Sequence, residues 1–339
     1  MTYKTIFTGR LEFGNARSYD KVLKMYQHRV ENYYKSDVLL NEEDIFDQEA
    51  SCLNVPRYIT QGSEKSWKNT YSLLEYIAQF AVSGNLVAWM TEEGKILHHG
   101  IVEPQSDKVA VQQFLKGKKL LKEKGKESEA MEALNRAIEK YERHAQAYER
   151  RGQVNFLLKN YEDAVYDYSK SIDISAGNPE PYFGRATVHV LNGDLDAAID
   201  DFAQAVKKSI PLQNIYWKSR RFKGECLMKK EDYAGALQDF KFFTKRNFKA
   251  DNPNLLWKRQ CFYNYGICLM KTEAYVEAVE AFQECINLTQ GNDNIPDGDK
   301  WMHLGTCKEK AGKTGFLKAW KKAVELGSTG AKMILKNRK

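Results

Sequence analysis

The chain has 339 residues, of which 42% are hydrophobic and 12% aromatic, values typical of a protein that buries a sizeable core. Its most apolar stretch, residues 72–90, is interrupted by polar side chains and falls short of the roughly 20 apolar residues that span a bilayer. The net charge is +7, and the six cysteines are too few for a disulfide scaffold and form no close pair of the zinc or redox type.

The start of the chain, residues 1–10, has no basic stretch followed by an apolar segment, which argues against a secretory leader. Together with the cysteine pattern, this predicts a cytoplasmic location, no membrane partner, and no metal or other cofactor.

The first hundred residues alternate between strand-like and helix-like patterns. Residues 3–13 predict a strand, and residues 18–34 predict a helix with Ser18 as the N-cap candidate. Residues 51–60 predict an edge strand, because Pro56 has no amide to donate to a neighbour. Ser63 is expected to cap a second helix that runs to residue 82. A hairpin follows, residues 86–90 and 95–102.

This order predicts a small α+β domain over residues 1–104, with both helices on one face of a sheet. The order of the strands does not follow from the sequence. The domain is loosely similar to ferredoxin-like modules, although no motif carries that likeness.

A repeated pattern begins after residue 104. Small and aromatic residues recur at the same offsets 34 residues apart, first as Tyr148, Gly152, Ala164 and Tyr168 and then as Tyr182, Ala186, Ala198 and Phe202. Later copies place the small residue at Gly224, Gly266 and Gly305, and a degenerate first copy places it at Gly117. Six copies between about residues 110 and 326 therefore predict an array of paired helices.

This pattern resembles that of the tetratricopeptide repeat family, whose copies carry aromatic, Leu-Gly and Ala residues at fixed positions. The resemblance implies a mainly α chain: an α-solenoid of about six helical hairpins over residues 105–326, with residues 327–339 as a capping helix and tail. Small residues at the eighth and twentieth positions would let the two helices of a hairpin approach closely. The aromatic at the twenty-fourth position would fill the space against the next hairpin.

The spacing of the copies is not uniform. Successive eighth positions lie 35, 34, 38, 42 and 39 residues apart, which places insertions around residues 210–215, 248–254 and 290–300. These insertions are expected to project as loops or to extend helices. In the last copy, Phe316 stands near where Ala is expected. Residues 323–337 predict a final capping helix that ends in the basic residues Lys336, Arg338 and Lys339, as a helix C-terminus favours.

Three features that suggest chemistry have simpler interpretations. Gly312-Lys313-Thr314 ends like a phosphate-binding loop, but Cys307 stands where the first glycine belongs, so a turn between helices is expected. His98 and His99 are neighbours on a strand and point to opposite faces, so they are expected to be surface or edge residues rather than metal ligands. The thiols of Cys268, Cys285 and Cys307 are expected to be buried in helix contacts.

The family resemblance assigns a binding groove to the second, fifth, ninth, twelfth and thirteenth positions of each first helix. The candidate groove residues are Gln146, Glu149, Gln153, Phe156, Phe183, Thr187, Val190, Lys218, Arg221, Glu225, Met228, Tyr263, Ile267 and Met270. Some family members bind acidic chaperone termini through a clamp of Lys and Asn. The corresponding positions here hold Phe114, Lys118, Arg150, Glu180 and Gly184, which do not reproduce that clamp.

These features predict a non-enzymatic adaptor that docks a protein or peptide with acidic and apolar residues in the groove. The alternative is RNA or DNA binding through residues 207–259, the basic sector, which carries a charge of +9 and interleaves aromatics with Lys and Arg. A third possibility, an enzyme in residues 1–104, finds no nucleophile–base pair or paired carboxylates there.

Overall fold

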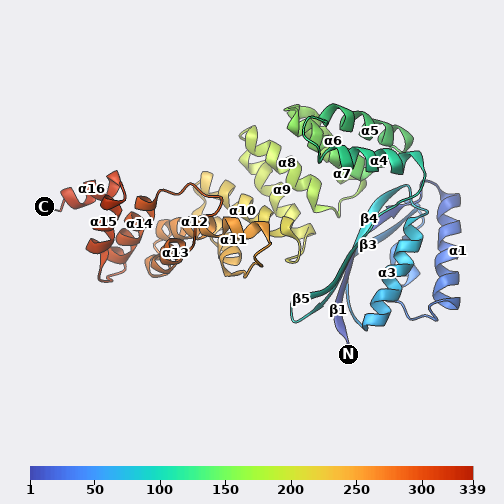
Figure 1. The fold of residues 1–339 in the computed structure, drawn as a ribbon, viewed down its shortest axis with the longest axis horizontal. Helices are drawn as coiled ribbons and strands as arrows, with labels where there is room; N and C mark the ends of the chain where they lie inside the picture. Colours follow the sequence, from blue (N-terminus) through green and yellow to red (C-terminus); the bar gives the residue numbers. More distant parts are fainter. Residues whose placement is uncertain (339) are drawn as a thin grey trace. The chain divides into compact units, whose positions relative to one another are not determined.

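The computed structural model describes residues 1–338. The chain divides into two compact units, Met1–Val188 and the residues from His189 onward, and the boundary lies inside helix α8 (Pro179–Leu191). The first unit joins the N-terminal domain to the first helices of the array (Figure 1). The domain limits at residues 104 and 326 stay predictions. Among the described residues, no helix has the length and apolar character needed to cross a bilayer.

A five-stranded antiparallel sheet forms the centre of the N-terminal domain. Its strands are β1 (Tyr3–Glu12), β2 (Phe46–Asp47), β3 (Cys52–Gly62), β4 (Ser83–Glu92) and β5 (Lys95–Val102), in the order β2-β3-β1-β4-β5. Apart from the short α2, the elements up to β4 follow one another as βαββαβ, and their strands lie in the order β2-β3-β1-β4, which is the arrangement of ferredoxin-like modules. Strand β5 adds a fifth strand to the sheet beside β4.

The helices of this domain are α1 (Ala16–Asn32), the short α2 (Glu42–Ile45) and α3 (Glu64–Ala78). Helices α1 and α3 lie on the same face of the sheet, as the sequence predicts (Figure 1). Their buried side chains share one core with the strands, and Tyr26 and Ile77 meet Phe7 and Leu53 there.

The structure corrects several predicted boundaries. Helix α1 begins at Ala16, because the side chain of Asn15, not Ser18, is the cap and accepts a hydrogen bond from the Ser18 amide (2.9 Å). Helix α3 begins after Ser63 as predicted but ends at Ala78 rather than at residue 82. The segment after it joins the sheet: β4 begins at Ser83 and pairs with β1 from Ser83 to Thr91.

Strand β3 lies between β2 and β1, so the prediction of an edge strand is wrong for the strand as a whole and holds only locally at Pro56. Strand β2 pairs only with Leu53 and Cys52, so within residues 1–338 no strand lies beyond Pro56 on that side. On the other side, the register between β1 and β3 shifts between Phe7 and Gly9, at the level of Pro56. The missing proline amide therefore interrupts no regular part of the ladder.

After the sheet domain, residues 105–338 form six successive helix pairs and one final helix, as predicted. The pairs are α4 (Val109–Leu120) and α5 (Glu127–Lys140), α6 (Ala145–Leu157) and α7 (Tyr161–Ile174), α8 and α9 (Leu195–Lys208), α10 (Asn214–Lys229) and α11 (Tyr233–Lys245), α12 (Lys258–Lys271) and α13 (Tyr275–Asn287), and α14 (Asp297–Lys310) and α15 (Phe316–Glu325). Within each compact unit, a helix packs against the next one along the chain.

The small residues of the first helices let the two helices of a pair approach closely, as their spacing predicts. A Cβ atom added to Gly224 would lie 2.8 Å from Cζ of Phe240, and one added to Gly305 would lie 2.5 Å from Cδ1 of Trp320. Both aromatic rings are fully buried. The aromatic of the second helix therefore fills the gap that the glycine of the first helix leaves, in the last pair as well as in the earlier one.

The turns inside the helix pairs share one backbone conformation. A residue with positive φ precedes the second helix in all six pairs: Gly125 (85°), Lys159 (63°), Gly193 (80°), Glu231 (62°), Glu273 (62°) and Gly312 (66°). Gly312-Lys313-Thr314 thus forms the turn between α14 and α15, which confirms the interpretation of this segment as a turn.

The insertions between pairs adopt defined structure. The 248–254 insertion leads into a 3-10 helix, η1 (Pro253–Trp257). The amide of Asn292, from the 290–300 insertion, donates to the carbonyl oxygen of Leu256 (2.9 Å), so these two insertions contact each other. In the first insertion, the indole of Trp217 donates to the carbonyl oxygen of Pro211 (2.9 Å).

The predicted tail helix over residues 323–337 is wrong in its start. Ala323 belongs to α15, and Gly327, with a φ of 88°, separates that helix from α16 (Thr329–Lys336). The Ser328 side chain caps α16 by accepting a hydrogen bond from the Ala331 amide. Arg338 forms an ion pair with Glu309 and lies over the Trp320 ring, and Lys339 is outside the described residues.

Candidate functional site

The N-terminal domain packs directly on the first helix pairs within the first unit. Lys118 of α4 forms an ion pair with Glu103 (2.7 Å), and the hydroxyl of Tyr141 donates to Glu12 (3.0 Å). Gln146, one of the candidate groove residues, accepts a hydrogen bond from the backbone amide of Gly84 in β4 (2.9 Å). This side chain therefore holds the sheet domain against the array.

The other candidate groove residues of the first unit are mostly bonded to their neighbours. Buried Glu149 accepts a hydrogen bond from Asn178 (3.1 Å), and half-buried Gln153 accepts one from Arg150 (3.1 Å). The remaining members form a mixed aromatic and polar surface: Phe156 and Thr187 are half-buried, and Phe183 is buried.

In the second unit, Arg221 lies inside the structure instead of facing an open groove. Only 4% of its surface is exposed, its guanidinium donates to Glu225 (2.8 Å), and it lies 3.9 Å from the centre of the Trp257 ring. Burial raises the pKa of Glu225 in spite of the neighbouring Arg221. This pair is a packed internal contact that the 248–257 segment covers through Trp257.

The apolar candidates of the second unit remain at the surface. Met228, Tyr263, Ile267 and Met270 are half-buried and pack on the cores of their repeats. The Tyr263 ring lies edge-on to Phe282 (5.9 Å), and its pKa is raised to about 12 by burial. Val190 is also half-buried, and Lys218 is exposed. These residues offer partly exposed apolar side chains on three successive first helices.

Several cations of the basic sector pair with carboxylates inside the fold. Arg220 (2.5 Å) and Lys223 (2.9 Å) both form ion pairs with buried Asp239. The guanidinium nitrogens of Arg259 lie 3.6 Å from a carboxylate oxygen of Asp293 and 3.3 Å from one of Asp297, and both of these acidic residues are outside the sector. These three cations are therefore less available to phosphates than the charge count of the sequence suggests.

The aromatics of the same sector are also occupied. Trp217 and Phe243 are buried and contact each other with Phe248, while Phe222 stacks on Phe202. Trp257 is under Arg221 as described above, and exposed Phe242 lies under the guanidinium of Arg220 (4.7 Å). These rings hold the fold together and are poorly placed to stack bases.

A set of ion pairs that the sequence analysis missed links the helices of single repeats. Asp167, Asp201 and Asp239 are buried at the same position of three successive second helices. Arg151 forms two hydrogen bonds with Asp167 (2.6 and 2.9 Å). The signal was present, since Arg or Lys stands at the seventh position and Asp at the twenty-third in all three copies.

The two adjacent histidines lie on opposite faces of the sheet, as predicted. His98 stacks on Trp67 of α3, and His99 stacks on Trp89 of β4. The predicted burial of Cys268, Cys285 and Cys307 is confirmed as well, and burial raises the pKa of these thiols to about 12, 11 and 12.

Comparison with known proteins now identifies the array. A family model described as "Tetratricopeptide repeat" matches residues 119–179 and 183–241. The helical array is a tetratricopeptide repeat array. The chain is 30% identical over 129 residues to human tetratricopeptide repeat protein 13, and 24% identical over 193 residues to a TPR repeat-containing protein of Methanocaldococcus jannaschii. The matches cover 38% and 54% of this chain but only 14% and 31% of those relatives.

Solved structures show the same fold. The TPR protein YrrB covers 61% of this chain with 99% of its own length, at a TM-score of 0.51 and 18% identity. At this identity the likeness establishes the arrangement of the repeats and nothing about their ligand.

Proposed function

We propose that this chain is a non-enzymatic cytoplasmic adaptor that docks a protein or peptide on the first helices of its tetratricopeptide repeats. The observation that carries the proposal is the set of half-buried apolar side chains Met228, Tyr263, Ile267 and Met270 on first helices of the second unit. Repeat arrays present such residues as extended binding surfaces, and an apolar anchor of a partner would cover them.

Two further observations support this proposal. YrrB is described as a TPR protein with an unusual peptide-binding site, so the same fold is associated with peptides. All six cysteines are buried as free thiols, which fits a reducing compartment. The finer expectation of a partner with acidic as well as apolar residues rests on exposed Lys218 beside the apolar set.

We favour a peptide over RNA or DNA because Arg220, Arg221, Lys223 and Arg259 are paired with carboxylates inside the fold. A filter-binding titration at two salt concentrations separates the two classes. Nucleic-acid binding requires an affinity that falls steeply as salt rises, because counterions are released from phosphates.

The direct test replaces two apolar groove residues. A Met228→Ser/Met270→Ser double variant should lose the partners that the wild-type chain captures from its own cells, measured by quantitative mass spectrometry. The matched control is Val276→Ser, since Val276 is an apolar residue of α13 that is 48% exposed and outside the first helices. Equal capture by the double variant and the control, with melting temperatures unchanged, would refute the groove.

A further inference from the structure

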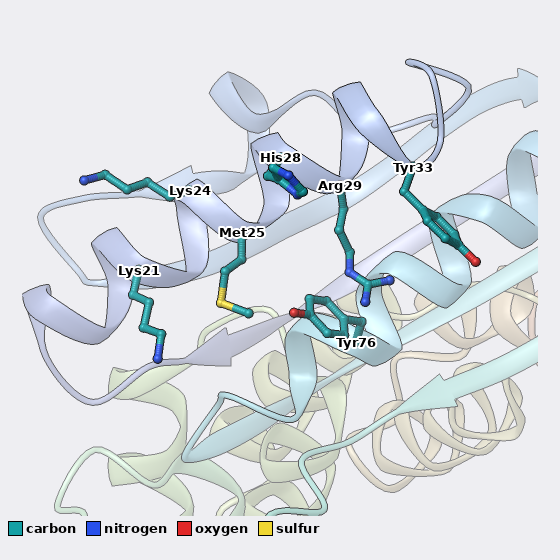
Figure 2. A pocket seen from close by; sticks show the side chains of 7 residues that line it. All are labelled: Lys21, Lys24, Met25, His28, Arg29, Tyr33 and Tyr76. Carbon is teal, nitrogen blue, oxygen red and sulfur yellow. The ribbon is translucent and has the colours of Figure 1, made fainter.

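A pocket lies on the outer side of the N-terminal domain, between α1 and α3. Its volume is about 460 Å³, and it opens along α1 (Figure 2). The residues that line it are Lys21, Lys24, Met25, His28, Arg29 and Tyr33 of α1 and its C-terminal end, and Tyr76 of α3. The array contributes none of them, so the pocket is separate from the groove described above.

The charge of this pocket is one-sided. Lys21, Lys24, His28 and Arg29 come from successive turns of α1, and in residues 1–338 none of them forms an ion pair with a carboxylate. The nearest acidic side chains in sequence, Asp20, Glu31 and Glu75, are exposed. This contrasts with Arg220 and Lys223 of the basic sector, which both pair with Asp239.

The floor of the pocket is apolar and holds one cation in place. Figure 2 shows the Met25 side chain and Arg29 directed toward Tyr76. The Arg29 guanidinium lies 3.5 Å from the centre of the Tyr76 ring and 5.4 Å from that of Tyr33. Stacking on an aromatic ring fixes the plane of a guanidinium and leaves its edge N–H groups able to bind an oxyanion.

We propose that this pocket binds an acidic peptide segment. Carboxylates of the segment pair with Lys21, Lys24 and Arg29, and one apolar side chain of the segment rests on Met25. The site gives the N-terminal domain a second point of contact with a partner, and it stands or falls independently of the groove.

A peptide fits better than a nucleic acid for two reasons. The pocket has room for only one or two side chains, whereas a single-stranded nucleic acid lies along an extended groove that contacts several nucleotides. The face of Tyr76 that would stack a base is already covered by Arg29.

The test uses the full chain and fluorescence anisotropy with two labelled peptides. One carries Glu residues on both sides of a Leu-Leu pair, and the other has Lys in place of every Glu. Saturable binding is expected for the acidic peptide alone. Lys21→Glu/Lys24→Glu should weaken it by about tenfold or more, since two favourable contacts become repulsive.

Three controls make the outcome decisive. Lys116→Glu/Lys119→Glu makes the same charge change at exposed positions of α4 and should bind like the wild type. Lys21→Gln/Lys24→Gln should weaken binding less than the reversal, and it replaces the reversal if that variant fails to fold. Binding that Met228→Ser/Met270→Ser weakens and Lys21→Glu/Lys24→Glu does not would place the peptide in the groove, so failure of the pocket and failure of the groove are distinguishable.

Absence of saturable binding overturns the proposal, as does equal weakening by the two charge-reversal pairs. The proposal is also overturned if oligouridine binds more tightly than the peptide and no longer binds the Lys21→Glu/Lys24→Glu variant. That result would assign the pocket to nucleic acid.

Discussion

The imidazole of His144 makes the first unit sensitive to acid. Its side chain is fully buried at the start of α6, where Nδ1 accepts a hydrogen bond from the Ala147 amide (3.3 Å) and the ring lies 4.8 Å from Phe114. Among the described residues, Nε2 has no hydrogen-bond partner. Burial therefore lowers the pKa of His144 from 6.5 to about 3.

The direction of the effect follows from proton linkage. As the pH falls below about 6.5, the unfolded chain takes up a proton at this residue and the folded chain does not, so stability is lost until about pH 3. From pH 7 to pH 5 the loss from His144 amounts to about 2 kcal/mol. Above pH 7 this residue contributes almost no pH dependence.

The assay compares the wild type with His144→Asn by urea unfolding at pH 7 and pH 5. Asparagine is a good N-cap and does not titrate, so the variant should lose about 2 kcal/mol less than the wild type over this interval. Equal losses in the two proteins, or an NMR titration of His144 with a midpoint near pH 6.5, would refute the reasoning.

Three further changes test the packing of the repeats by denaturant unfolding. Arg151→Ala should lower the free energy of unfolding by about 3 kcal/mol at pH 7, because buried Asp167 loses its ion-pair partner. The loss should shrink in acid, since burial already raises the pKa of Asp167. A loss below about 1 kcal/mol at pH 7 would contradict this prediction. Glu231→Gly should stabilise the chain by about 0.5–1 kcal/mol, because Glu231 has a φ of 62°, and a destabilised variant would count against the turn geometry. Gly224→Ala should destabilise by about 1–3 kcal/mol through overlap with Phe240, whereas a neutral result would mean that the crossing is looser.

The repeats were predictable because their packing depends on local offsets. The gap at Gly224 and the ring of Phe240 that fills it lie 16 residues apart in one helix pair, and the same offset recurs along the chain. Because such a contact joins residues at a fixed separation in the sequence, the number of helix pairs and the position of the turns follow from the sequence. The buried Asp167 with Arg151 obeys the same rule and could have been found in the same way.

The sheet domain was predictable only in its elements. The pairing of β1 with both β3 and β4 joins residues far apart in the chain, and no periodic pattern encodes such a choice. The pocket on α1 was missed because its floor combines Met25 with Tyr76 of another helix. The sequence shows only an amphipathic helix with basic residues on its outer side.

The state of the candidate groove residues also depends on parts of the chain outside the repeat pattern. Arg221 occupies a groove position by its spacing, but Trp257 from the 248–257 segment covers it. Gln146 likewise contacts the sheet domain through Gly84. Insertions and neighbouring domains occupy positions that a repeat consensus would leave open.

The binding surface is tested most directly by placing a photo-crosslinking amino acid at one position at a time in living cells. Crosslinkers at Met228 and Met270 should capture the same partner, while one at exposed Val276 should capture none. Adducts that form only at Val276, or equally at all three positions, would show that the first helices of the repeats are not where the partner binds.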